Sequence, residues 1–142
     1  MNIDRLKADL ERDEGVVEHA YQDHLGYWTI GVGRLIDKRR GGGLSHDEMV
    51  YLLGNDIDRK TAEMDRRMPW WRDLDPVRAR GLVNMAFNLG VAGVLNFRNM
   101  CAALRSGDWQ RAHDEALNSL WARQVGQRSQ RIADMFLTGG DA

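Results

Sequence analysis

From Ser45 almost to its end, the sequence places apolar residues three and four apart, which restricts the fold to a mainly helical class. Ser45-His46-Asp47-Glu48 has the form of a capping box and predicts a helix of about twenty residues that ends before Pro69. Further helices are predicted over residues 76–89, 97–106, a segment after Asp108, and about 127–138. Glycines at positions 90, 107 and 139 are expected to end three of them.

The first 44 residues have a different pattern. Residues 2–13 are predicted to form a helix, with Asn2 as its N-cap and Gly15 ending it. The run Gly26–Gly33 is aromatic and β-branched, and it predicts a hairpin with residues 20–23. A short third strand is expected near the basic, glycine-rich loop at residues 38–43.

These elements predict an α+β, mainly helical architecture within one domain of 142 residues. A small β-bearing lobe covers residues of about 12–60, and a long helix connects it to a helical lobe. The helical lobe covers residues of about 66–142 and includes the N-terminal helix. We expect a cleft between the two lobes.

Composition excludes several classes of protein. Hydrophobic residues make up 43% of the chain and charged residues 29%, a balance that excludes disorder and a membrane span. One cysteine, Cys101, and four scattered histidines offer no zinc-ligand spacing, so neither a metal nor an organic cofactor is expected. The charged N-terminus lacks an apolar core segment, and we expect no signal peptide.

Charge is distributed unevenly along the chain. Residues 1–65 carry a balance of −5 and residues 66–142 a balance of +4, within a net charge of −1. The basic half offers Arg123, Arg128 and Arg131 for attraction to an anionic polymer, although a solvated helix face explains them better. Nucleic-acid binding is not expected, because no aromatic residues are interleaved with these arginines as stacking platforms.

Glu14, Asp23 and Thr29 are the candidate catalytic residues. Glu14 lies at the negative end of a predicted helix, a position that raises the pKa of a carboxyl group and suits a general acid. Asp23 lies beside a turn, in a more solvated setting, and Thr29 lies on the returning strand, where its hydroxyl can hold a water molecule. Two carboxyl groups with different pKa values are what glycosidic cleavage requires. By composition alone, a chain with 21 acidic residues contains many such pairs.

The residues around these three positions closely resemble the bacteriophage lysozymes of the T-even type. Eight residues separate Glu14 from Asp23 and five separate Asp23 from Thr29, as in that family's catalytic motif. The glycine and aromatic context of residues 26–33 matches as well. The resemblance covers nearly the whole chain, continuing through Ser45–Asp58, Leu74–Gly90, Trp109, Ser119–Trp121 and Arg128–Gly139.

The resemblance implies a lysozyme-like fold and hydrolysis of the β-1,4 bond between N-acetylmuramic acid and N-acetylglucosamine in peptidoglycan, with inversion at the anomeric carbon. It implies that Glu14 is the general acid, that Asp23 stabilises positive charge or acts as the base, and that Thr29 places the water. The family is described as inverting, and this predicts a separation of roughly 6.5–9.5 Å between the carboxyl groups of Glu14 and Asp23.

The resemblance also implies a set of substrate-binding positions. An arginine that approaches the acid in this family corresponds to Arg128 here. The implied set is Leu35, Phe87, Asn88, Gln124 and Arg128. From the residues alone, Phe87 fits a core position equally well, and Trp109 and Trp121 fit the core better than a sugar platform.

The chain departs from the family pattern at several points. Arg34 stands where histidine is common, and we expect it to pair with Asp56 on the long helix. Met100 and Glu115 replace polar or small residues of the cleft, so no binding role is transferred to them. The β-lobe is shortened after Leu35.

Two other functions remain open at this point. A lytic transglycosylase cuts the same bond but needs only one acid, and a non-catalytic glycan-binding module keeps the fold without the reaction. For the lysozyme reading, we expect a monomer that accumulates in the host cytoplasm without inserting into a membrane. It would reach the cell wall with the help of a holin.

Overall fold

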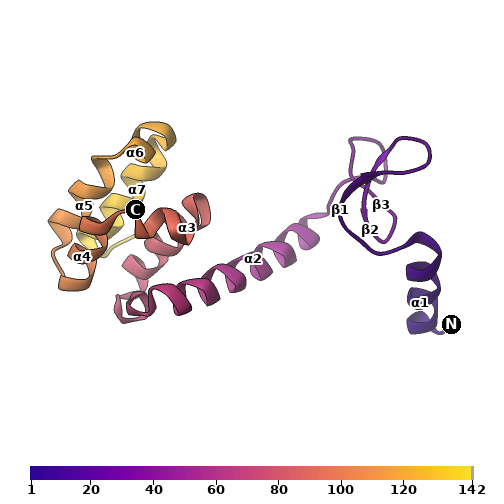
Figure 1. Ribbon diagram of the computed structural model, residues 1–142, viewed down its shortest axis with the longest axis horizontal. Coiled ribbons are helices and arrows are strands. Elements are labelled where there is room, and N and C mark those ends of the chain that lie inside the picture. Colours follow the sequence, from indigo (N-terminus) through magenta and orange to yellow (C-terminus); the bar gives the residue numbers. More distant parts are fainter. Residues whose placement is uncertain (142) are drawn as a thin grey trace. The chain divides into compact units, whose positions relative to one another are not determined.

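The computed structural model describes residues 1–141, which form two compact units, one of residues 1–52 and one that begins at Leu53. The described chain contains seven α-helices, one 3-10 helix and one antiparallel sheet of three strands (Figure 1). This confirms the α+β, mainly helical fold class. None of the helices in this part of the chain has the length and apolar character needed to cross a membrane.

The first unit consists of one helix, a three-stranded meander and the start of a long helix. Its elements are α1 (Ile3–Glu14), β1 (Val17–Gln22), β2 (Trp28–Gly31), β3 (Arg34–Leu35) and the first turns of α2 (His46–Arg67). Asn2 caps α1 as predicted, because its side chain accepts the backbone N–H of Arg5 at 3.0 Å. The strands follow the order β1-β2-β3, with Thr29 opposite both Tyr21 and Leu35.

Two strand positions differ from the sequence prediction. β1 begins at Val17, three residues before the predicted start of the hairpin. β3 follows directly after Gly33, well before the loop at residues 38–43 where a third strand was expected. β1 extends farther from the hairpin turn, where Val17 pairs with Gly31, and β3 pairs with β2 directly after the turn at residues 32–33.

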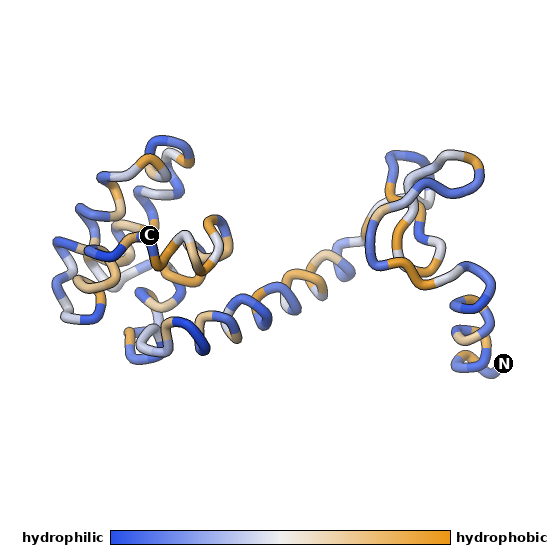
Figure 2. Tube along the Cα trace, viewed as in Figure 1, coloured by the Kyte–Doolittle hydropathy of each residue, from blue (hydrophilic) through white to orange (hydrophobic). Residues whose placement is uncertain are grey.

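The predicted capping box begins helix α2. The backbone N–H of Ser45 donates to Oε1 of Glu48 at 2.9 Å, and the backbone N–H of Glu48 donates to Oγ of Ser45 at 3.3 Å. Hydrophilic and hydrophobic residues alternate along the helix (Figure 2), as an amphipathic sequence requires. The helix ends at Arg67, before Pro69, and the boundary between the two units falls within it.

The second unit is entirely helical within the residues described. After α2 it contains η1 (Pro69–Asp73), α3 (Pro76–Leu95), α4 (Arg98–Ser106), α5 (Trp109–Leu117), α6 (Leu120–Val125) and α7 (Gln127–Thr138). Asp75 and Asp108 cap α3 and α5 as predicted, each accepting a backbone N–H in the first turn. Gly107 and Gly139 end α4 and α7 in the left-handed conformation, also as predicted.

Gly90 interrupts α3 but does not end it. Its backbone angles are φ 79° and ψ 160°, outside the helical region, and helical structure resumes up to Leu95. The predicted end of the helix at Gly90 is therefore a break between two helical segments. The second segment, η1 and α6 could not be predicted from the sequence, because each is too short to show a helical period.

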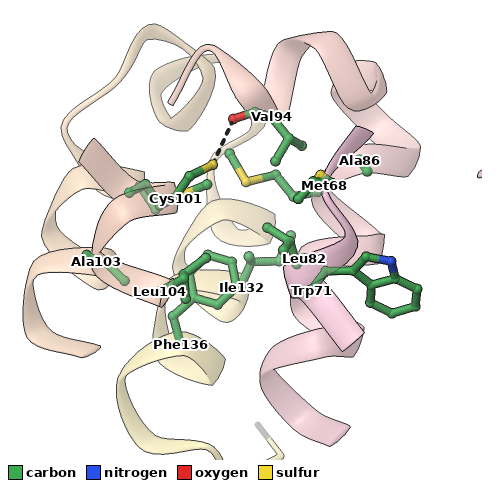
Figure 3. Packing of buried hydrophobic residues seen from close by; sticks show 14 of the residues in the cluster. Met68, Trp71, Leu82, Ala86, Val94, Cys101, Ala103, Leu104, Ile132 and Phe136 are labelled. Atoms are coloured by element: carbon green, nitrogen blue, oxygen red, sulfur yellow. Dashed lines mark hydrogen bonds between the residues drawn. The ribbon is translucent and has the colours of Figure 1, made fainter. Parts of the chain in front are cut away.

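The hydrophobic core lies in the second unit (Figure 3). Phe136, Ile132, Leu104 and Leu82 gather at its centre, and all four are at most 1% exposed. Trp121 is also buried and Trp109 packs against the same cluster, as the sequence predicted. The free thiol of Cys101 lies in this core, where it donates to the backbone oxygen of Val94 at 3.5 Å. In residues 1–52, Thr29 alone is buried.

Candidate active site

Glu14 is the last residue of α1, as predicted. The helix ends there because Gly15 adopts φ 79° and ψ 162°, and the Gly15 N–H donates to the backbone oxygen of Glu11 at 2.9 Å. The Glu14 side chain is exposed at the negative end of the helix. It is therefore a carboxylate held at the junction between a helix and the sheet that follows.

Gly33, in the turn between β2 and β3, lies against the Glu14 side chain. A Cβ atom at Gly33 would lie 2.9 Å from Oε2 of Glu14 and 3.1 Å from its Cδ. Only glycine leaves this space, and its φ of +68° also favours glycine. Gly33 was not among the predicted site residues, because residues 26–33 were expected to form one strand; two glycines separated by a single residue, Gly31 and Gly33, are the signal that could have indicated a turn.

Asp23 is fixed in the turn between β1 and β2. Its Oδ1 accepts the backbone N–H groups of Leu25 at 2.9 Å and of Tyr27 at 2.8 Å. The backbone N–H of Asp23 donates to the oxygen of Tyr27 at 2.8 Å, which closes the turn. No group within residues 1–141 donates a hydrogen bond to Oδ2 of Asp23. The turn therefore orients a half-buried carboxylate and leaves one of its oxygens unoccupied.

Thr29 is held close to this turn through Tyr27. Thr29 is only 5% exposed, and its Oγ1 donates to the backbone oxygen of Tyr27 at 3.0 Å. The same Tyr27 peptide oxygen accepts the Asp23 N–H. The Thr29 hydroxyl thus uses its proton within the protein and keeps its oxygen as an acceptor.

The two carboxylates lie toward opposite ends of β2. Asp23 lies in the turn before Trp28, whereas Glu14 contacts the turn after Gly31. The four residues of this strand span about 10 Å. The first unit therefore brings a helix-terminal glutamate and a turn-bound aspartate to the two ends of one short strand, and Thr29 lies within that strand.

Arg34, at the start of β3, pairs with Glu48 and not with Asp56 as predicted. Its Nη1 lies 2.9 Å from Oε1 and 2.7 Å from Oε2 of Glu48, and it also donates to the backbone oxygen of Gly43 at 3.2 Å. The capping box brings Glu48 close to this strand, and a carboxylate with two oxygens serves both partners. From the sequence, Glu48 was expected to act only in the capping box of α2.

The pKa of the Glu48 carboxyl is lowered from 4.5 to about 2, chiefly by the hydrogen bond from Arg34 and then by those from Ser45. Because the folded pKa lies below the unfolded one, the ionised carboxylate stabilises the fold above pH 4.5. That contribution is lost as the pH falls through about 2. We expect Glu48→Gln to make the free energy of unfolding less dependent on pH in this interval. Urea unfolding at a series of pH values measures it.

Glu63→Gln is the matched control for this prediction, since Glu63 is another glutamate of α2 and pairs with Arg67 at 3.3 Å. Glu63→Gln is expected to keep the wild-type pH dependence between pH 4.5 and 2. Equal slopes for the wild type and Glu48→Gln would contradict the assignment.

The other predicted binding residues belong to two different units. Leu35 is half-buried on β3 in the first unit, whereas Phe87, Asn88, Gln124 and Arg128 belong to the second.

Phe87 is 39% exposed, so it is not a core residue. It borders two hollows of the second unit. One, of about 330 Å³, is charged and lined by Asp56, Arg59, Lys60, Glu63 and Phe87. The other, of about 270 Å³, is more apolar and lined by Leu53, Ile57, Arg80, Val83, Asn84, Phe87 and Arg128.

Arg128 and Asn88 have partners within the second unit. Nε and Nη2 of Arg128 donate to Oδ1 of Asn84 at 3.0 and 2.8 Å, which holds the guanidinium at the edge of the more apolar hollow. Oδ1 of Asn88 accepts the indole N–H of Trp121 at 2.8 Å, which leaves the amide nitrogen of Asn88 for other contacts. Gln124 is exposed on α6.

Of the two positions that depart from the family pattern, Met100 is fully buried and belongs to the core. Glu115 is half-buried on α5. Across residues 1–141, no three or more His, Cys, Asp or Glu side chains are grouped so that they could hold a metal ion.

Comparison with known proteins gives one family and several relatives. Residues 11–134 match the family described as phage lysozyme. The chain is 32% identical to the pre-baseplate central spike protein Gp5 of Enterobacteria phage T4, over 92% of this chain but only 27% of Gp5. It is 28% and 26% identical to probable T4-type lysozymes 1 and 2 of Dictyostelium discoideum, over 96% of each chain. The match extends almost from end to end of the two lysozyme relatives and spans about a quarter of Gp5.

Proposed function

Because the chain belongs to the phage lysozyme family, we propose that it cleaves the β-1,4 bond between N-acetylmuramic acid and N-acetylglucosamine in peptidoglycan. Family membership and the similarity to T4-type lysozymes support a glycoside hydrolase that acts on peptidoglycan. The identity of the cleaved glycosidic bond, the mechanism and a role in host lysis go beyond family membership and are part of this proposal.

The observation that carries the proposal is the arrangement of Glu14, Asp23 and Thr29 around β2. Glu14 is the general acid and protonates the leaving glycosidic oxygen. Asp23, with one oxygen held by the turn and the other unoccupied, stabilises positive charge on the sugar or acts as the base toward water. Thr29 accepts a hydrogen bond from that water. A strand length of about 10 Å between the two turns supports the wider carboxyl spacing of inverting glycosidases.

The proposed substrate contacts of the second unit are Phe87, Asn88, Gln124 and Arg128, and Leu35 is the proposed contact of the first unit. Phe87 offers an exposed aromatic surface, and Arg128 presents a guanidinium whose orientation Asn84 fixes. These groups suit the apolar face and the acetamido groups of an N-acetylated sugar.

We further propose that the chain forms a single lysozyme-like domain and acts as a monomer. In a host cell it would accumulate in the cytoplasm and reach the wall after a holin opens the membrane. It is proposed to act without a metal or organic cofactor.

Mass analysis of the products released from purified peptidoglycan tests the reaction. Muropeptides with reducing ends support hydrolysis. Products with 1,6-anhydro ends would replace the proposal with a lytic transglycosylase, and no release from several wall types would leave a glycan-binding module. The anomeric configuration of freshly formed products, followed by NMR, tests inversion.

Gly33→Ala is expected to reduce wall hydrolysis by about 100-fold, the effect of a misplacement of roughly 1 Å at a catalytic group. The new methyl group would occupy the space within 2.9 Å of Oε2 of Glu14 and push the carboxylate away. The measurement is the initial rate at which a suspension of peptidoglycan clears.

Gly31→Ala is the matched control, because Gly31 has the same φ of +68° but nothing lies within 4 Å of a Cβ atom there. Both variants carry similar backbone strain, and only Gly33→Ala meets Glu14. Equal losses of activity in the two variants would assign the effect to strain and contradict the steric argument.

A further inference from the structure

One hollow of the second unit contains none of the residues proposed for catalysis or substrate binding. It has a volume of about 630 Å³ and lies among η1, the start of α3, and the junction between α4 and α5. Its size is within the roughly 300–1,000 Å³ of small-molecule pockets. Two tryptophans, Trp70 and Trp109, contribute to its wall together with Asp73 and Arg105.

The indole N–H groups of these two tryptophans are free. Trp71 and Trp121 donate their indole N–H groups to Asp65 and Asn88, both within 2.9 Å. Trp70 and Trp109 have no acceptor within residues 1–141, and no buried side-chain nitrogen or oxygen there lacks a partner. The indole nitrogens of the two half-buried tryptophans are therefore open to solvent.

The two rings offer different surfaces. The guanidinium of Arg78 covers one face of Trp109, 3.8 Å from the ring centroid, and is held there by the backbone oxygens of Phe136 and Leu137. Trp109 is thus a rigid donor. Arg105 lies 5.8 Å from the Trp70 centroid, near the outer limit of about 6 Å for a cation–π contact, so it covers that ring less closely than Arg78 covers Trp109.

The charges of the hollow favour a neutral ligand. Asp73 is exposed and makes no ion pair or hydrogen bond with the residues described, whereas Asp75 pairs with Arg78 at 3.0 Å. The free carboxylate of Asp73 and the guanidinium of Arg105 balance each other. A polyanion gains little from such a pair, but a carboxylate accepts hydrogen bonds from hydroxyl and amide groups.

We propose that this hollow is a second carbohydrate site, which binds an N-acetylated hexosamine unit of a glycan strand. Trp70 provides a face for the apolar side of the sugar ring, the two indole N–H groups donate to its oxygens, and Asp73 accepts from a hydroxyl or acetamido N–H. The carbohydrate class follows from these groups, and the choice of a peptidoglycan strand rests on the proposed function. Such a site would keep the enzyme on the polymer between cleavage events.

The test uses the full chain carrying Glu14→Gln, labelled with ¹⁵N at the tryptophan indoles, and a soluble, uncharged tetrasaccharide of β-1,4-linked N-acetylglucosamine. Trp→Phe variants assign the five indole signals. Saturable shifts of the Trp70 and Trp109 signals, with the Trp71 signal unmoved, support the site. The Trp121 signal is not used as a control, because its indole N–H donates to Asn88, a proposed substrate contact. Unmoved Trp70 and Trp109 signals up to about 10 mM sugar, well into the range of weak binding, overturn it.

Binding of the same protein to insoluble peptidoglycan gives the second readout. Trp70→Ala and Asp73→Asn are each expected to weaken binding about threefold to tenfold, and Trp70→Phe, which keeps a ring, less so. Leu120→Ala, at a residue 61% exposed and outside the hollow, is the control and should bind as before. Unchanged binding in both Trp70→Ala and Asp73→Asn overturns the proposal.

The experiments distinguish a failure of the proposed function from a failure of the second carbohydrate site. If the wild type releases no products from peptidoglycan while the indole signals still shift, the proposed function is wrong and the second site stands. If products are released while those signals do not move, the second site is wrong and the proposed function stands.

Discussion

Glu14→Gln is expected to lower the rate of peptidoglycan hydrolysis by about 10²–10⁴-fold, the usual contribution of a positioned general acid. The amide keeps the size of the side chain and its place at the end of α1, beside Gly33, but has no proton to give to the leaving oxygen. Binding of the glycan should therefore change little while turnover is lost. Initial clearing rates and sedimentation of bound protein measure the two effects separately.

Asp13→Asn is the matched control for the loss of turnover. Asp13 is the preceding residue of the same helix, is exposed, and pairs with Arg12 at 3.0 Å. An exposed pair of this kind contributes little to stability, so this variant should keep nearly full activity. A Glu14→Gln protein with more than about a tenth of the wild-type rate would contradict the role of Glu14 as the acid.

Phe136→Ala is expected to lower the free energy of unfolding of the second unit by about 3–5 kcal/mol. The ring of Phe136 is 0% exposed on α7, beside Ile132 and Leu104 (Figure 3), and lies so close to Gly81 that a Cβ atom there would be 3.3 Å from it. Its removal leaves a cavity that the backbone of α3 cannot fill by a small shift. Urea unfolding followed by circular dichroism at 222 nm measures the change.

Leu120→Ala gives the comparison for stability, because Leu120 is 61% exposed. Truncation there should change the free energy of unfolding by no more than about 0.5 kcal/mol. A loss below about 1 kcal/mol for Phe136→Ala would mean that the core collapses around the missing ring, contrary to the packing described.

Most helices could be predicted from the sequence because their ends depend on local chemistry. Asn2, Asp75 and Asp108 cap helices with their own side chains, and Gly107 and Gly139 end helices in a conformation that glycine adopts at little cost. Gly90 marks the limit of this reasoning. A glycine with positive φ shows where regular geometry stops, but the packing of Val91 and Val94 in the core decides that the chain becomes helical again.

In the candidate site, too, features set by local sequence could be predicted, and features set by long-range packing could not. The positions of Glu14 at a helix end and Asp23 in a turn could be predicted, because neighbouring glycines define both. The contact of Gly33 with Glu14 joins residues 19 positions apart through the return of the chain over β1 and β2, which no local pattern encodes. The pairing of Arg34 with Glu48 likewise depends on where the loop at residues 36–45 delivers the start of α2.

The thiol of Cys101 can be used to measure how often the core of the second unit opens. It is the chain's only thiol, burial raises its pKa to about 11, and its Sγ donates inside the core. At neutral pH an alkylating reagent therefore reacts at an appreciable rate only with molecules whose core has opened. The rate of alkylation, read by mass, counts these opening events under native conditions with no label introduced. The first unit has no cysteine, so its opening does not contribute to the measured rate of alkylation.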